Sequence, residues 1–381
     1  MIKLIPYIFK TLWRHRSRTL LTVTGSAVAL FVFCFVGSVQ EGMNDLQRRQ
    51  SGKRSLITFQ ANKFCPATSH LPQDYESAIL KLDGVKEVIP IQVFTNNCRA
   101  SLDVVVFYGV PPQKLQTARP DFKMQSGNWE DFKANQDSAV MGRAVANRRG
   151  VKVGDKFSIG DLSVVVAGIY DAEDPAEENY IYSHLDFLQR TKGMNLVGTV
   201  TQLEVLLEQT ADADLLCRQI DEKYLAGPVE TDTRPKGVFQ AKSLGDLTEL
   251  IGLAHYLGLA CVGLVLALVA TTTVMSVQDR IKEHSVLQTI GYSGNKVFQL
   301  VMAESVTLSM MGGMFGVIIA MIVLQWSSLS VGAEAVTIAF TPSFSLAVTG
   351  LGVALLTGLL AGLIPAWQAS RTDIVTGLRQ I

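Results

Sequence analysis

Four long apolar stretches constrain this chain more than any other feature of its sequence. Residues 19–40 contain no charged residue, and residues 250–278 contain one histidine but no Asp, Glu, Lys or Arg. A third stretch covers residues 300–325 with a single acid, Glu304, and the fourth lies within 344–367. A helix needs roughly 20 apolar residues to cross a bilayer. The sequence therefore predicts four membrane-spanning helices, at 19–40, 250–277, 297–325 and 344–367.

The distribution of basic residues predicts the orientation of these helices. Residues 1–18 carry five Lys or Arg and no acid, and they are expected to form an amphipathic helix on the membrane surface. Because cytoplasmic flanks collect Lys and Arg, the N-terminus is expected inside. Alternation then places 278–296 and the tail 368–381 inside and the loop 326–343, which lacks Lys and Arg, outside. We expect a multi-pass protein of the cell (inner) membrane with both termini cytoplasmic.

The same topology places residues 41–249 outside the membrane, and this block reads as mixed α/β. Strand-like runs such as LDVVVFYGV and LSVVVAGIYD alternate with helix patterns such as ADADLLCRQIDEKY. Gly84, Gly150 and Gly193 stand where a turn or helix stop is expected. Pro and Gly near 109–112 and 193–198 suggest a smaller lobe inserted in a larger one. The predicted fold class is four transmembrane α-helices, one plus three, with a large α/β extracytoplasmic domain between helices 1 and 2.

No catalytic, cofactor-binding or metal-binding set is recognisable in the sequence. It contains no HExxH, CxxC or GxSxG motif and no phosphate loop ending in GK[ST], and its five histidines are scattered. The acidic run DAEDPAEEN (171–179) lacks the residue order of a calcium loop, so a solvated surface loop is expected there. Cys65 and Cys98 could form a disulfide in an oxidising compartment or stay free. Nothing points to nucleic acid as a partner.

The segment 278–296 is a compact mixed-charge island between two spans. A helix through 278–290 would carry a polar stripe and an opposite apolar arc. The polar stripe consists of Arg280, His284 and Gln288, and the apolar arc of Val286, Leu287 and Ile290. This pattern predicts a helix that docks on a cytoplasmic partner, the alternative being an ordinary solvated hairpin.

One acid does not fit the apolar arc of this helix. Glu283 falls inside it, where it could reach Arg280 three residues earlier or a cation on a partner. Gly291 supplies the helix stop.

The island also carries a family pattern. The string SVQDRIKEHSVLQTIGYSGNKVFQLVMAES (276–305) resembles the coupling region of MacB/FtsX-like ABC transporter permeases. The residues that match are Ser276, Val277, Arg280, Glu283, Gly291 and Glu304, whereas His284, Ser285 and Thr289 depart from the pattern. The closing segment IPAWQASRTDIVTGLRQ and the outer segments GVKEVIP, FYGVPP, GRAVANRRGVKVGDKFSI and VVVAGIYD resemble the same family in the same order.

This resemblance implies a function. In the family, the helix between spans two and three fits a groove on a separate ATP-binding subunit, which binds the ATP and magnesium. The contacts would fall on Arg280, Glu283, His284, Leu287 and Gly291. The chain would then be a non-catalytic permease subunit that exports or releases a lipophilic molecule, a peptide or a lipoprotein. Two alternatives stay open: a mechanotransmitter that activates an envelope hydrolase, and a receptor or scaffold without an ATPase.

Small residues repeat every four positions in the predicted spans. Gly312 and Gly316 form one such ridge, and Gly358 and Gly362 form another. Ridges of this kind let helices approach closely, either within one bundle or between two subunits. The resemblance favours a second permease copy or a paralogue as a partner. An adaptor or outer-membrane protein is a further candidate partner, and the spans contact membrane lipid.

Overall fold

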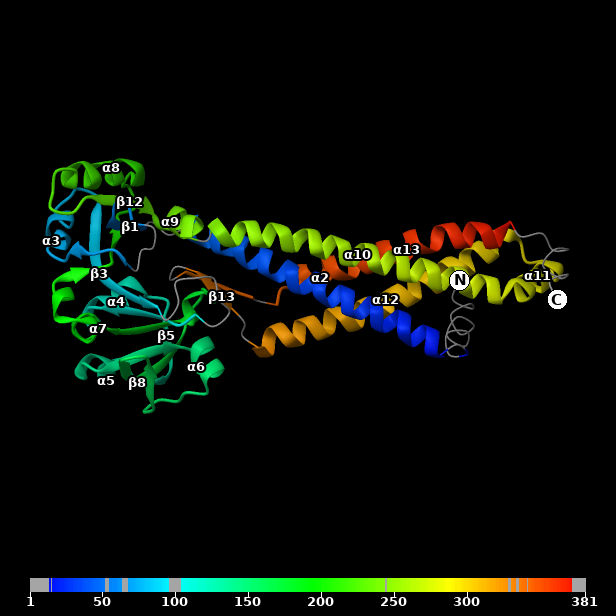
Figure 1. Cartoon of the computed structure of the whole chain (residues 1–381), viewed down its shortest axis with the longest axis horizontal. Coiled ribbons are helices and arrows are strands. Elements are labelled where there is room, and N and C mark those ends of the chain that lie inside the picture. The colour runs from blue at the N-terminus through cyan, green and yellow to red at the C-terminus, as the bar shows by residue number, and fades with distance from the viewer. Residues whose placement is uncertain are drawn as a thin grey trace. The chain divides into compact units, whose positions relative to one another are not determined.

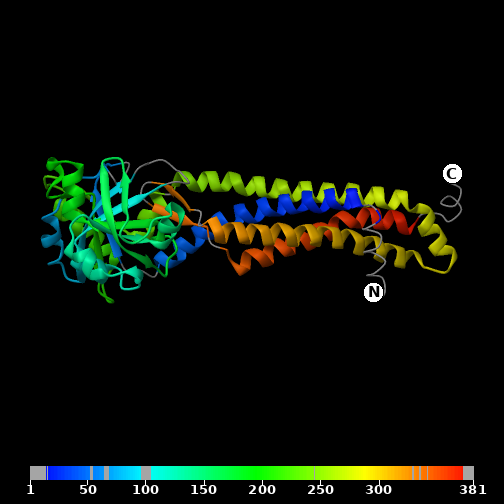
Figure 2. The same ribbon diagram turned by 90° about the horizontal axis from the view of Figure 1, so that it is seen from below.

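The computed structural model describes residues 14, 16–51, 55–63, 68–95, 104–243, 245–327, 330–333, 336–340 and 342–371. The chain divides into two compact units. The helical unit comprises residues 1–40, 251–326 and 342–381, and the sheet unit comprises residues 41–250 and 327–341. Figures 1 and 2 show the elements of each unit.

Four long helices make up most of the helical unit. They are α2 (Arg16–Ser51), α10 (Gly245–Asp279), α12 (Gly294–Ser327) and α13 (Phe344–Ser370). Each contains a segment long and apolar enough to cross a membrane: Arg16–Gly42, Gly252–Asp279, Gly294–Trp326 and Phe344–Ser370. Many of their large apolar side chains are exposed, which suits a surface that faces lipid.

The glycines of the small-residue ridges lie where these helices meet one another. A Cβ atom at Gly312 would lie 3.0 Å from the Val23 carbonyl oxygen of α2, and one at Gly316 would overlap the Ala27 carbonyl oxygen. On α13, a Cβ at Gly358 would lie 2.9 Å from Val306 Cα of α12. One at Gly362 would overlap the Ser305 hydroxyl, so the ridges bring α2, α12 and α13 of one chain together.

The sheet unit is built on one ten-stranded mixed sheet. Its strands lie in the order β12-β1-β11-β3-β4-β9-β6-β8-β5, with β7 paired to β8. They are β1 (Ser55–Gln60), β3 (Val85–Thr95), β4 (Val106–Val110), β5 (Lys123–Gly127), β6 (Ser138–Gly142), β7 (Lys156–Ile159), β8 (Leu162–Asp171), β9 (Tyr180–His184), β11 (Gln202–Leu207) and β12 (Thr231–Pro235). Short strands β2 (Leu71–Pro72) and β10 (Thr199–Val200) pair with each other.

Short helices cover this sheet. They are α3 (Tyr75–Ile79), α4 (Pro112–Ala118), α5 (Trp129–Ala134), α6 (Arg143–Arg149), α7 (Leu185–Lys192), α8 (Ala213–Tyr224) and α9 (Lys236–Ser243), with 3₁₀ turns over Glu177–Asn179 and Met194–Leu196. Their order along the chain follows the expected alternation of strands and helices. Gly84 and Gly150 both have positive φ, at the turn into β3 and at the end of α6, as their positions in the sequence predict.

Long strand β3 joins two lobes of one continuous sheet and contributes side chains to the core of each. Its first part pairs with β11, and its last four residues pair with β4. The first lobe, residues 55–95 and 199–243, has a core of β1, β3 and β11 residues packed on α3 and α8. The inserted lobe, residues 104–193, has one core of its own around β6 and β8, and a second core around β4 and β9 that it shares with β3. An inserted lobe is therefore present, as the Pro and Gly clusters suggest.

Two segments differ from the expectations for loops and helix ends. The loop expected at 326–343 contains a β-hairpin, β13 (Ser330–Ala333) and β14 (Val336–Ala339), which belongs to the sheet unit. Helix α10 continues to Asp279, so the helix expected over 278–290 begins only at Ile281. Most of the surface helix expected over 1–18, the pair Cys65 and Cys98 and most of the tail 368–381 lie outside the described residues, and residues 16–18 belong to α2.

Candidate functional site

Helix α11 (Ile281–Thr289) forms the island between the second and third long helices. Arg280 separates it from α10 with a non-helical backbone (φ −118°, ψ 14°). At the other end, Gly291 has φ +99°, its amide donates to the Gln288 carbonyl, and the Tyr292 amide donates to the Leu287 carbonyl. This pair of bonds is the Schellman ending that a glycine in the left-handed region makes. The sequence was right that Gly291 stops the helix.

A buried ion pair anchors the start of α11 to α12. The Arg280 guanidinium lies 3.0 Å from Glu304 Oε2, and the Ser276 hydroxyl donates to Glu304 Oε1 at 2.8 Å. Arg280 is only 4% exposed and Glu304 6% exposed. Burying charges is costly unless they are paired and hydrogen-bonded, and here both carboxylate oxygens have donors. The ion pair therefore fixes α11 relative to α10 and α12.

This placement corrects the polar stripe expected from the sequence. Arg280 was predicted to share an open stripe with His284 and Gln288, but the break after Asp279 takes it out of the helix and turns its side chain onto Glu304. The His284 side chain lies outside the described residues, and Leu287 is half-buried.

Glu283 forms the expected contact with Arg280, at 3.1 Å from Arg280 Nε. Its side chain is 43% exposed and also lies 3.2 Å from Arg14. A second exposed pair joins Arg18 of α2 to Asp279 at 2.7 Å. Exposed pairs of this kind contribute about 0–1 kcal/mol each. They connect Arg14 to α11 and the first turn of α2 to the end of α10, more weakly than Glu304 holds Arg280.

The rest of α11 leaves apolar side chains uncovered. Val286 is 44% exposed and Ile290 73% exposed, and Tyr292 just beyond the helix is also exposed. These residues lie outside the segments of α10 and α12 that could lie in lipid by hydropathy. An anchored short helix with an open apolar edge is the geometry of a docking element.

The sheet unit holds a second group of polar residues, within the acidic run 171–179. This run was expected to be a solvated surface loop, and that expectation is wrong. Asp174, Glu177, Glu178 and Asn179 are all buried. Arg143 pairs with Glu178 at 3.0 Å and with Asp171 at 3.2 Å. No cluster of three or more His, Cys, Asp or Glu suited to a metal occurs among the residues that the structure describes.

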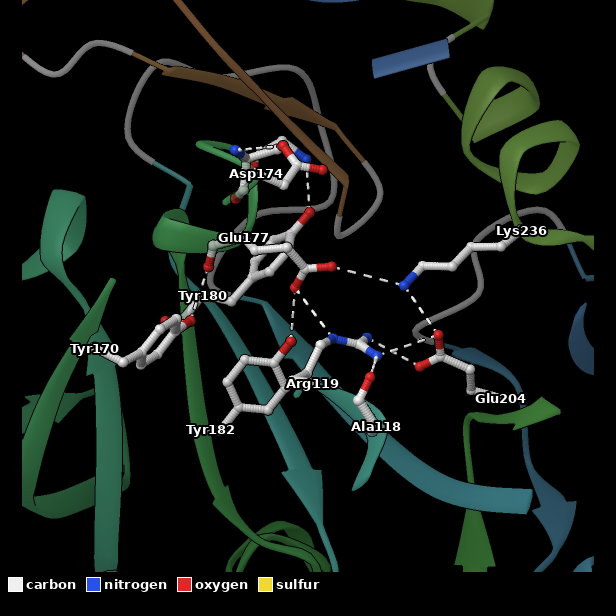
Figure 3. A network of polar contacts seen from close by, with 11 residues as sticks. Ala118, Arg119, Tyr170, Asp174, Glu177, Tyr180, Tyr182, Glu204 and Lys236 are labelled. Atoms are coloured by element: carbon white, nitrogen blue, oxygen red, sulfur yellow. Dashed lines mark hydrogen bonds and ion pairs between the residues drawn. The ribbon is translucent and has the colours of Figure 1, made fainter. Parts of the chain in front are cut away.

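Glu177 belongs to a closed ring of four buried charges, shown in Figure 3. Arg119 lies 2.9 Å from Glu204 and 3.5 Å from Glu177, and Lys236 lies 3.0 Å from Glu204 and 3.6 Å from Glu177. The Tyr182 hydroxyl donates to Glu177 at 2.8 Å. We call Arg119, Glu177, Glu204 and Lys236 the charge ring. The sequence alone does not show that these four residues lie together. The acidic run 171–179 inside a strand-rich domain was the one sequence feature that could have pointed to buried charges there.

The charges of the ring stabilise one another. Burial alone would raise the pKa of Glu204, but Arg119 and Lys236 outweigh this effect and lower that pKa to about 2. Burial would lower the pKa of Arg119, but Glu177 and Glu204 hold it well above its ordinary value. Burial and the Glu177 charge raise the pKa of Tyr182, so its hydroxyl stays protonated and able to donate. Arg119 and Glu204 are therefore both charged at neutral pH.

Comparison with known protein families matches both units. The MacB-like periplasmic core domain matches residues 19–223, and the FtsX-like permease C-terminal domain matches residues 257–374. The chain belongs to the MacB/FtsX-type permeases of ABC transporters. As a member of this family it is a membrane protein with four spans and a periplasmic-type domain between the first two. Neither matched domain is an ATPase, and the family implies an ATPase partner.

Two relatives align over nearly all of this permease. It is 22% identical to an uncharacterized ABC transporter permease of Methanocaldococcus jannaschii, over 99% of this chain and 97% of that protein. It is 25% identical to the macrolide export ATP-binding/permease protein MacB of Rhodospirillum rubrum, over 95% of this chain and 58% of MacB. It thus spans less than two thirds of that MacB.

Solved structures also resemble part of the permease. The periplasmic region of MacB from Actinobacillus actinomycetemcomitans aligns with a TM-score of 0.37 at 13% identity, over 50% of this chain and 93% of that one. The extracellular domain of the ABC-type transporter YknZ from Gram-positive bacteria aligns with a TM-score of 0.36 at 13% identity. This alignment covers 47% of this chain and 98% of the YknZ domain.

Proposed function

We propose that this permease couples ATP hydrolysis by a separate ATP-binding subunit to motion of its sheet unit. The motion exports or releases a lipophilic molecule, a peptide or a lipoprotein. In this arrangement α11 and both termini face the cytoplasm, and the sheet unit lies outside. ATP and magnesium bind to the partner subunit, and a second permease copy or paralogue completes the membrane part.

The observation that carries the proposal is the way α11 is held. A docking helix passes on force only if it cannot slide relative to the helices it drives. The ion pair of Arg280 and Glu304 fixes the residue just before α11 to α12, and the Gly291 turn leads directly into α12 at the other end. Between these two anchors, Val286 and Ile290 offer apolar surface to a partner.

The contact with the ATPase can be tested with one substitution. Tagged permease is purified from detergent-solubilised membranes, and co-purifying proteins that carry a phosphate-binding loop are identified and quantified. Ile290→Asp should cut recovery of the ATPase roughly tenfold or more, because burying an isoleucine side chain contributes about 1.5–3 kcal/mol. Ile290 is mostly exposed, so the variant should still fold.

The matched control is Asn295→Asp, which places the same acid on an exposed position five residues further on. It should recover as much ATPase as the native chain. If the native permease recovers no such ATPase, the proposed function is wrong. If Ile290→Asp recovers as much as the control, docking does not use the apolar edge of α11.

A further inference from the structure

The charge ring joins the two lobes of the sheet unit through residues of each lobe. Arg119 and Glu177 belong to the inserted lobe, whereas Glu204 and Lys236 belong to the first lobe. Each cation contacts one carboxylate from each lobe. Removing any member therefore weakens the connection between lobes as well as the balance of charge.

Lys236 also brings the ring into contact with the chain that leads to the membrane. It is the first residue of α9 (Lys236–Ser243), and the chain continues from α9 into α10, which starts at Gly245. Phe239 of α9 packs on Ile57 and Phe59 of β1. The ring is thus connected along the chain to the start of α10 by the eight residues of α9, about two turns of helix.

A second connection from the long helices reaches the same segment. The β13–β14 hairpin lies between α12 and α13 in the chain. The Thr337 amide donates to the Tyr180 hydroxyl at 3.2 Å, and the Thr337 hydroxyl donates to the Ala176 carbonyl at 3.1 Å. Ala176 directly precedes Glu177 in the chain, and Tyr180 follows it by three residues. Both the α9 connection and the hairpin therefore contact residues 176–180.

A small cavity beside the ring provides room for rearrangement. It measures about 20 Å³, space for about one water molecule, and α9 forms one wall with Lys236, Phe239 and Gln240. Among the described residues, the buried Gln240 Oε1 lacks a hydrogen-bond partner, and Arg119 Nε has only the 3.5 Å ion-pair contact with Glu177; both residues line this cavity. A buried donor and a buried acceptor that share a cavity can pair if α9 shifts. A shift of α9 that brought Gln240 Oε1 to Arg119 Nε would give both atoms a hydrogen bond.

We propose that the charge ring is a latch through which α9 controls the inserted lobe. In the structure, Lys236 closes the ring and holds Glu177 and the 176–180 segment against the first lobe. When α10 pulls α9, Lys236 leaves the two carboxylates, Gln240 accepts from Arg119, and the inserted lobe is released. The inference rests on the proposed function, since it needs nucleotide-driven movement of α10.

The test is hydrogen exchange, measured by mass spectrometry on the permease purified with its co-purifying ATPase, with and without ATP. Peptides that cover 171–184 report on release of the inserted lobe. In the native complex, ATP should raise their exchange rate roughly tenfold. The variant Lys236→Met/Glu204→Gln removes one positive and one negative charge, so Arg119 and Glu177 remain a balanced pair. It should still recover the ATPase, but its exchange should no longer respond to ATP.

Lys242→Met is the matched control, because Lys242 is an exposed residue of the same helix. It should respond to ATP as the native chain does. A full ATP response in Lys236→Met/Glu204→Gln would overturn the latch and leave the proposed function intact. The latch is equally wrong if the native complex contains the ATPase but residues 171–184 show no response. Absence of the ATPase from the native preparation would refute the proposed function itself.

Discussion

The buried pair of Arg280 and Glu304 leads to a quantitative prediction about stability. Arg280→Met removes the guanidinium and leaves the buried Glu304 carboxylate with only the Ser276 hydroxyl as donor. Removing one partner of a buried ion pair costs about 3–5 kcal/mol, because the other charge stays buried without compensation. Arg280→Met/Glu304→Gln removes both charges, and an amide can still accept from Ser276. The double variant should therefore be about 2 kcal/mol more stable than the single variant.

Unfolding in mixed micelles of dodecylmaltoside and dodecyl sulfate, followed by circular dichroism, measures these free energies. Lys282→Met is the control, since Lys282 is exposed on α11 and its replacement should change stability by less than about 0.5 kcal/mol. The reasoning is refuted if Arg280→Met costs no more than Lys282→Met. It is also refuted if the double variant is as unstable as the single one, because the cost would then not come from the unpaired carboxylate.

Three further predictions follow from the geometry. Because the pKa of Glu204 is lowered to about 2, below its unfolded value of about 4.3, its stabilising charge is fully present above pH 4.3. This contribution should disappear as the pH falls toward 2, and acid unfolding of Glu204→Gln should lose that part of the pH dependence. Gly316→Ala places a methyl group against the Ala27 carbonyl and should cost about 1–3 kcal/mol in a thermal melt, whereas Gly352→Ala, with open space at its Cβ, should cost nothing. Gly291→Ala meets no neighbouring atom but must adopt φ +99°, so it should destabilise the α11 ending by about 1 kcal/mol, measured by amide exchange of residues 286–292.

The amino-acid sequence alone determined the number of long helices, the position of the α/β domain and the stop at Gly291. These features depend on local composition: runs of about 20 apolar residues, alternation in strands, and a glycine where φ must be positive. The same local patterns indicated the inserted lobe, because Pro and Gly cluster shortly after its start, at 109–112, and at its end, at 193–198. The family resemblance rested on six residues of the string 276–305 and on the closing and outer segments in their order.

Only the tertiary structure decided where the charged residues lie. A helical wheel puts Arg280 on an open stripe, but one non-helical residue turned its side chain onto Glu304, 24 positions away. The run 171–179 has the composition of a solvated loop, yet Glu177 is buried because Arg119 and Lys236 come to it from distant parts of the chain. Composition cannot show this, since burial of a charge depends on which opposite charges the fold brings within about 4 Å. The spans followed from the sequence because hydrophobicity acts locally, whereas the charge ring exists only once the first lobe and the inserted lobe have folded together.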